Sequence, residues 1–96
     1  MTTGADDGYE VRVTATAARS LQALPPRVAE HLVAFIFGSL RADPRRRGKP
    51  LKRDLTGFWS ARRGDYRVIY HLDEDTKTLH VYRVSHRAHA YRQRSS

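Results

Sequence analysis

Apolar and charged residues alternate over residues 9–13, which predicts a strand with one buried face. Beyond them the apolar residues recur at helical spacing. This spacing predicts a short helix that is capped by Thr14 or Thr16 and ends before Pro25. A second, longer helix is expected from Pro26, which suits a first helical turn, to the break at Asp43–Pro44. The first half of the chain therefore predicts one strand and two helices.

Three segments of the second half alternate as strands do, at residues 59–62, 66–72 and 79–85, and the short polar stretches between them predict tight turns. Residues 44–50, which precede them, contain three consecutive arginines, a glycine and two prolines, so a basic loop is expected there. In the middle strand Arg67 falls opposite the most apolar side. Helices covering that apolar side would leave Arg67 on the open face of the sheet.

These elements predict an α+β fold, with an antiparallel or mixed β-sheet of about four strands and two N-terminal helices packed on one face. Ninety-six residues are enough for one such two-layer unit and too few for two cores. We expect residues 1–8, which show no apolar periodicity, to form a disordered lead-in, and residues 9–96 to form the single domain.

The composition restricts the setting and the chemistry. The chain has no cysteine and no apolar stretch near the roughly 18 to 20 residues that a membrane span needs. We therefore expect a soluble, cytoplasmic protein with no membrane association. Five histidines are present, but no carboxylate or cysteine cluster accompanies them, so neither a metal site nor a cofactor is expected.

The formal charge of +8 is unevenly distributed. Residues 1–40 hold three arginines and four acidic residues, whereas residues 41–96 hold fifteen basic and six acidic residues. Between Gly48 and Tyr70 the basic side chains are interleaved with aromatic ones, a combination that binds single-stranded nucleic acid through phosphate neutralisation and base stacking. Trp59 is expected in the core instead. On charge alone, a solvated basic face or a surface for an acidic protein are the alternatives.

Two motifs carry a family resemblance. The segment GKPLKRDLTGFWSARRGDYRVIY, residues 48–70, resembles the part of RelE and YoeB toxins that leads into an arginine-bearing central strand. The tail VSHRAHAYR, residues 84–92, is similar to the ending of RelE-type toxins. Together with the order of elements, they make the chain similar to the RelE/ParE superfamily of bacterial toxins from about Tyr9 to Tyr91.

The resemblance implies the toxin of a type II toxin–antitoxin system. It implies an mRNA interferase, which is a ribosome-dependent endoribonuclease that cleaves mRNA in the ribosomal A site, inhibits translation and arrests growth. The ribose 2'-hydroxyl attacks the adjacent phosphate, and no metal is needed. The implied partners are a cognate RelB-like antitoxin, the 70S ribosome with its mRNA, and ribosomal RNA.

The resemblance also implies site residues. Arg67 aligns with the central-strand arginine, and its forked guanidinium suits contact with a phosphate. His86 is the proton-transfer candidate, because an unperturbed imidazole titrates near neutrality. Arg87 and Tyr91 match tail residues that orient and activate the reacting groups. The residues expected to bind RNA are Lys49, Lys52, Arg53, Arg62, Arg63 and His89.

Ordinary explanations remain open for these residues. Arg67 could pair with Asp65 or Glu10, and the tail residues could simply be solvated. Two departures from the family leave the general base unassigned. Leu51 stands where YoeB-like proteins carry a glutamate, and Phe58, Ser60 and Arg62 stand where RelE-like proteins carry lysines.

Two other functions are compatible with the fold. A ParE-like toxin of the same fold inhibits DNA gyrase and cuts nothing, and a chain without activity could serve mainly in a toxin–antitoxin repressor complex. The basic and aromatic residues at Arg67, His86, Arg87 and Tyr91 favour the nuclease, because the gyrase-inhibiting toxins generally lack such a cluster.

Overall fold

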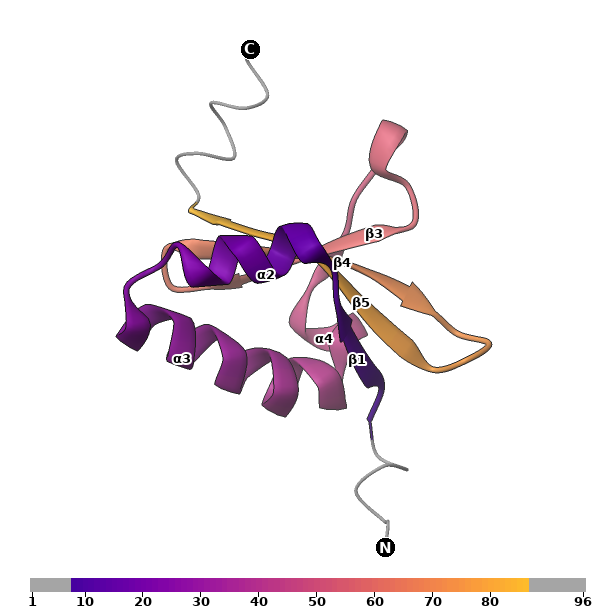
Figure 1. Ribbon diagram of the computed structural model, residues 1–96. Helices are drawn as coiled ribbons and strands as arrows, with labels where there is room; N and C mark the ends of the chain where they lie inside the picture. Colours follow the sequence, from indigo (N-terminus) through magenta and orange to yellow (C-terminus); the bar gives the residue numbers. More distant parts are fainter. Residues whose placement is uncertain (1–7, 87–96) are drawn as a thin grey trace, which may run out of the picture.

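The computed structural model describes residues 8–86, in which five strands form one sheet in the order β1-β5-β4-β3-β2 (Figure 1). The first strand pairs with the last in parallel, and the other neighbours are antiparallel. The strands are β1 (Glu10–Val13), β2 (Lys49–Pro50), β3 (Phe58–Arg63), β4 (Tyr66–Asp73) and β5 (Thr78–His86). The predicted α+β fold with a mixed sheet is confirmed, although the sheet has five strands instead of about four.

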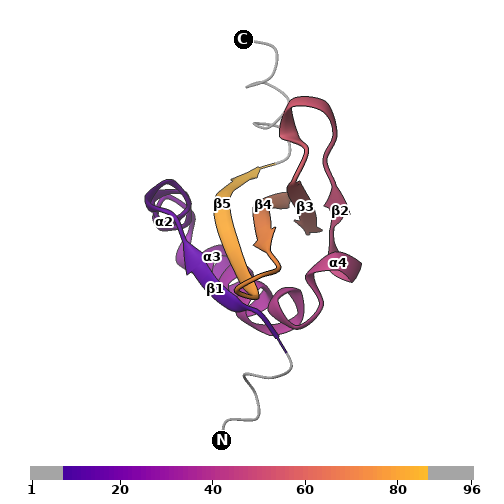
Figure 2. The same ribbon diagram turned by 90° about the vertical axis from the view of Figure 1, so that its right-hand side faces the viewer.

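Two helices cover one face of the sheet (Figure 2). Helix α2 (Ala15–Gln22) begins after Thr14, whose hydroxyl accepts a hydrogen bond from the Ala17 backbone N–H at 3.1 Å, so one of the two predicted caps is confirmed. Helix α3 (Pro26–Phe35) continues into a π-helical turn, Ile36–Leu40. No helix within residues 8–86 is long and apolar enough to cross a membrane.

The prediction of a basic loop at residues 44–50 is wrong, because this segment forms helix α4 (Pro44–Arg47) and then strand β2. The buried Tyr70 hydroxyl donates a hydrogen bond to the Pro44 carbonyl oxygen at 2.6 Å, and burial raises the pKa of Tyr70. Lys49 and Pro50 then pair with Ser60 and Trp59 of β3. The conformation of this segment is therefore fixed by β3 and β4, which lie later in the chain.

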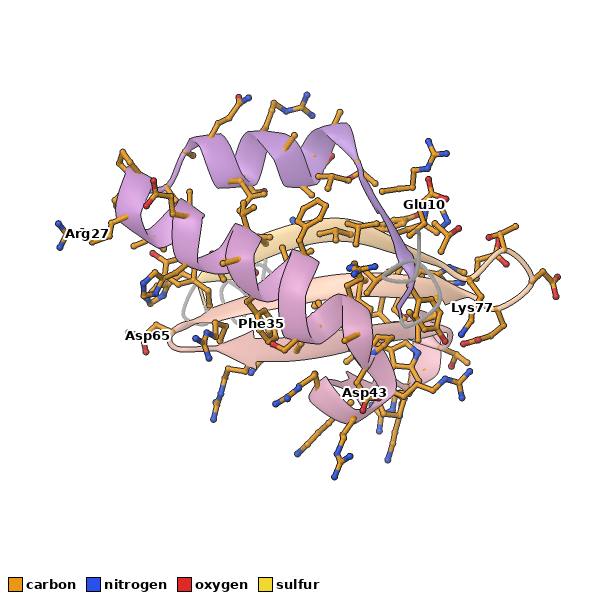
Figure 3. The ribbon with its side chains drawn as sticks, turned by 90° about the horizontal axis from the view of Figure 1, so that it is seen from below. Glu10, Arg27, Phe35, Asp43, Asp65 and Lys77 are labelled. Carbon is orange, nitrogen blue, oxygen red and sulfur yellow. The ribbon has the colours of Figure 1, made fainter. Side chains whose placement is uncertain are left out.

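The core lies between the helices and one face of the sheet. Val68 and Tyr70 of β4 point into it and are completely buried, together with Leu32 and Ile36 from the helical layer. Trp59 stacks on Tyr70 with ring centroids 6.5 Å apart, which confirms its place against the core. Figure 3 shows the side of the molecule covered by α3, with Phe35 between the helix and the strands. The other face of the sheet is open.

Candidate functional site

A groove with a volume of about 730 Å³ crosses the open face of the sheet. Thr14 and Thr16, at the start of α2, lie along one side of it, and Leu51 and Leu55, in the segment between β2 and β3, lie along the other. That segment projects from the sheet on the side away from α3 (Figure 1). The groove is therefore formed by the sheet and two segments that are distant in sequence.

Arginines gather at one end of this groove. Arg67 of β4 lines it and is half-buried, so the predicted exposure of Arg67 on the open face is confirmed. Arg62 of β3 lies directly opposite Arg67 in the sheet. Two guanidinium groups on neighbouring strands can both donate to one anion, so this pair is a candidate binding site for an anion.

Two further cations belong to the same face. Lys49 of β2 is opposite Ser60, and Arg83 of β5 is opposite Ile69, while both Ser60 and Ile69 line the groove. Among the residues that the structure describes, Lys49, Arg62 and Arg83 form no ion pair. Their charges are available to a ligand.

The projecting segment adds Lys52 and Arg53, both exposed. Arg53 has a φ of 60°, in the left-handed region that residues other than glycine rarely adopt. The Thr56 hydroxyl donates to the Arg53 carbonyl oxygen at 2.7 Å, which helps to hold this conformation. The structure thus places Lys52 and Arg53, two of the predicted RNA-binding residues, on the segment that borders the groove.

Arg63 and His86 lie on the other face of the sheet. The guanidinium of Arg63 is 5.6 Å from the centre of the Phe35 ring, beneath α3. The His86 ring packs edge-to-face on Tyr66 at 5.1 Å, and Tyr66 contacts the core. The structure therefore does not bring these two predicted site residues together with Arg67. The predicted residues Arg87, His89 and Tyr91 lie outside the described residues.

Aromatic rings lie toward the end of the groove that is away from Arg67. Phe58 contacts Tyr82 edge-to-face at 4.8 Å and His71 at 5.5 Å. His71 and His80 face each other across β4 and β5 with ring centroids 6.2 Å apart. In the described part of the chain they belong to no group of three potential metal ligands. This surface offers flat rings beside positive charge.

Sequence reasoning missed Tyr82 and Arg83, which both line the groove. A bulge in β5 explains the omission, since Tyr70 pairs with Val81 while Ile69 pairs with Arg83, leaving Tyr82 as the additional residue. The signal was present in the sequence. The buried apolar residues of β5 are two residues apart up to Val81, and the next one is three residues on, at Val84.

The chain matches the family model described as the ParE toxin of the type II toxin–antitoxin system parDE over residues 11–91. It belongs to this toxin family. It is therefore a toxin of a type II toxin–antitoxin system.

Its curated relatives include two toxins of Mycobacterium tuberculosis. The toxin RelG is 51% identical over 84 residues, which cover 88% of this chain and 97% of RelG. The toxin RelE is 48% identical over 87 residues, which cover 91% of this chain and 90% of that toxin.

Solved structures agree with this placement. The toxin–antitoxin complex RelBE2 from Mycobacterium tuberculosis contains a chain that is 51% identical with a TM-score of 0.81, and the match covers 84% of this chain and 93% of that one. The archaeal RelE–RelB complex from Pyrococcus horikoshii matches with a TM-score of 0.66 at 27% identity, over 83% of this chain and 96% of that one. The E. coli RelBE complex is similar in fold, with a TM-score of 0.66 at 17% identity over 81% and 95% of the two chains.

Proposed function

We propose that this toxin is a ribosome-dependent endoribonuclease that cleaves mRNA in the ribosomal A site and thereby stops translation. The ribose 2'-oxygen forms a bond to the adjacent phosphorus while the bond from phosphorus to the 5'-oxygen breaks, leaving a 2',3'-cyclic phosphate and a 5'-hydroxyl. A base takes the 2' proton, an acid protonates the 5'-oxygen, and a cation stabilises the charge that develops on the phosphoryl oxygens. The reaction needs no metal ion.

The arginine pair Arg62–Arg67 is the observation that carries this proposal. Two guanidinium groups at directly opposite positions can hold one phosphate from two strands, and each offers several N–H donors in a fixed plane. Such donors bind the phosphate more strongly as negative charge accumulates on its oxygens in the transition state. The names of the relatives RelG and RelE support the same reading.

The remaining roles follow from position and sequence. Lys49, Lys52 and Arg53 border the groove and are assigned to the backbone of mRNA or ribosomal RNA. On the tail motif alone, Arg87 and Tyr91 are assigned to orienting and activating the reacting groups, and His89 is assigned to RNA binding. Because the His86 ring packs on Tyr66 and faces away from Arg67, direct proton transfer by His86 requires that the imidazole leave Tyr66.

A cognate RelB-like antitoxin is the proposed protein partner. The three similar structures described above are all complexes of a Rel toxin with its antitoxin. The excess of basic residues favours an antitoxin segment rich in acidic and apolar residues, bound more weakly as salt is added.

Primer extension on mRNA from a translation reaction with intact ribosomes tests the proposal. The unmodified chain should cut within codons and should leave naked RNA uncut. Arg67→Ala should lower the cleavage rate at least about 100-fold, as the loss of one charge-stabilising donor typically does, and Arg67→Lys should retain part of the activity. Arg27→Ala, on the exposed start of α3, is the control. Unchanged cleavage by Arg67→Ala would contradict the assignment.

The same assay compares the contributions of His86 and Arg67 to cleavage. We expect His86→Gln to retain most of the activity, because its ring lies on the covered face. A loss as large as that of Arg67→Ala would mean that the imidazole leaves Tyr66 and takes part in proton transfer.

Inhibition of DNA gyrase is the second candidate function, and the match to the ParE family model favours it. It would be indicated by growth arrest without cleavage in any lane, together with loss of gyrase supercoiling activity when the purified chain is added.

A further inference from the structure

The bulge in β5 turns two successive residues to the same face of the sheet. In a regular strand, Tyr82 and Arg83 would point to opposite faces. Here both line the groove, since Tyr82 is the additional residue between the pairs formed by Val81 and Arg83. An aromatic ring and a guanidinium group therefore stand side by side on the open face.

Helix α2 holds this bulge in place. The Thr14 hydroxyl donates to the carbonyl oxygen of Tyr82 at 2.9 Å, and the Thr14 backbone N–H donates to the carbonyl oxygen of Val81 at 3.1 Å. The same hydroxyl caps α2 by accepting from Ala17. Bulges are frequent beside active sites, where they redirect a side chain. The orientation of Tyr82 is thus fixed by hydrogen bonds from another element.

The Tyr82 ring is supported yet accessible. Its neighbour Phe58 contacts it edge-to-face, and Tyr82 is still 47% exposed. Arg83 is opposite Ile69, two residues along β4 from Arg67, which is about 7 Å along a strand. Tyr82 and Arg83 therefore lie next to the arginine pair Arg62–Arg67 on the open face.

We propose that Tyr82 and Arg83 form a nucleotide-binding subsite, in which the Tyr82 ring stacks on a base of single-stranded RNA and Arg83 contacts a phosphate of the same strand. The proposal rests on the proposed function in taking RNA as the occupant of the groove. Exposed aromatic rings interleaved with cations bind single strands in this way. The cations of the groove match the charge of RNA, while Leu51 and Leu55, on one side of the groove, exclude water from the stacked base.

A double-mutant cycle, in which the protein and the RNA are changed separately and together, tests the stacking. The ligand is a short RNA whose 2'-oxygens are methylated, so that it cannot be cleaved, and a second version lacks one base. Tyr82→Leu should weaken binding of the complete RNA about ten-fold, while Tyr82→Phe should stay within about two-fold. For one abasic position, Tyr82→Leu should have almost no further effect, because the stacked pair is already broken. Arg83→Gln should weaken both ligands.

Phe37→Leu is the matched control, since Phe37 is 48% exposed on the π-helical turn, away from the groove. It should bind both ligands as the unmodified chain does. Additive losses at every abasic position would overturn the proposal. It would equally be overturned if Tyr82→Leu bound RNA normally but no longer co-purified with the cognate antitoxin, because the groove would then be a protein-docking surface.

Cleavage by the unmodified chain separates this inference from the proposed function. Ribosome-dependent cleavage with an additive binding cycle would remove the subsite and leave the nuclease. A non-additive cycle without cleavage would support the subsite as an RNA-binding surface and contradict the nuclease.

Discussion

A methyl group at residue 48 would collide with the Tyr70 hydroxyl, which makes glycine necessary at this position for reasons of space. The backbone is extended there, with φ of −125°, so any residue could adopt it. The hydroxyl that needs this space also donates to the Pro44 carbonyl oxygen. Gly48 therefore allows α4 to dock on β4, and Lys49 follows at once in β2.

We predict that Gly48→Ala lowers the free energy of unfolding by about 1–3 kcal/mol through overpacking. Tyr70→Phe should lower it by about 1–2 kcal/mol, because a buried hydrogen bond is lost. The double variant should lose less than the sum, since removing the hydroxyl relieves the tightest contact of the methyl group and leaves the Ser60 carbonyl oxygen and the Tyr70 ring carbon, each 3.0 Å from it. Urea unfolding of the four chains measures these values, and strict additivity would contradict the steric explanation.

Among the elements, those with one buried face were predictable. Strands β1, β3, β4 and β5 and helices α2 and α3 each have an apolar period that burial imposes. The period does not extend to α4 and β2, whose structure depends on contacts with Tyr70 and with β3. Local sequence therefore contained no signal for them.

The candidate site was predictable only where a strand alternates without interruption. Alternation in β4 placed Arg67 on the open face. Uninterrupted alternation from His80 would also have placed His86 there, but the bulge reverses the faces of β5 beyond Tyr82. His86 consequently packs on Tyr66, and Arg83 takes the place beside the groove.

A polar cluster joins three elements at the other end of the sheet. Glu74, in the turn between β4 and β5, accepts a hydrogen bond from the Tyr9 hydroxyl at 2.9 Å and pairs with Arg45 of α4. The hydrogen bond from Arg45, followed by that from Tyr9, holds the pKa of Glu74 below its usual value. The cluster links α4 and the start of β1 to the hairpin.

We predict that Glu74→Gln lowers the free energy of unfolding by about 1 kcal/mol or less at pH 7, because the pair is 46% exposed at Glu74. The pKa of Glu74 is lower in the folded chain than in the unfolded chain, where it is about 4.3. The stabilisation by the Glu74 carboxylate is therefore complete above this unfolded pKa and is lost as the pH falls through the folded pKa. The difference between the two chains should therefore vanish in acid. Urea unfolding at several pH values checks this, and a difference that persists at the lowest pH would contradict it.

Over the whole molecule, the cations of the groove gather at one end of the open face. Arg62 and Arg83 lie there beside Arg67, whereas at the opposite end Glu10 is paired with Arg12 at 3.4 Å and Asp73 lies on the other side of Thr78. A polyanion is attracted more strongly to the first end than to the second, where the carboxylate of Glu10 is already paired. Part of the excess of basic residues is thus placed where the proposed substrate binds.

This placement predicts how salt changes the affinity for single-stranded RNA. Each cation that neutralises a phosphate of a single strand contributes about 0.7 to the slope of log affinity against log salt concentration. Arg62→Gln and Arg83→Gln should each reduce the slope by about that amount. Arg27→Gln removes the same charge from a side chain that points away from the sheet (Figure 3), and it should leave the slope unchanged. Titrations with the non-cleavable RNA at several salt concentrations measure all three slopes. Equal reductions in the three variants would mean that net charge, and not the groove, attracts the RNA.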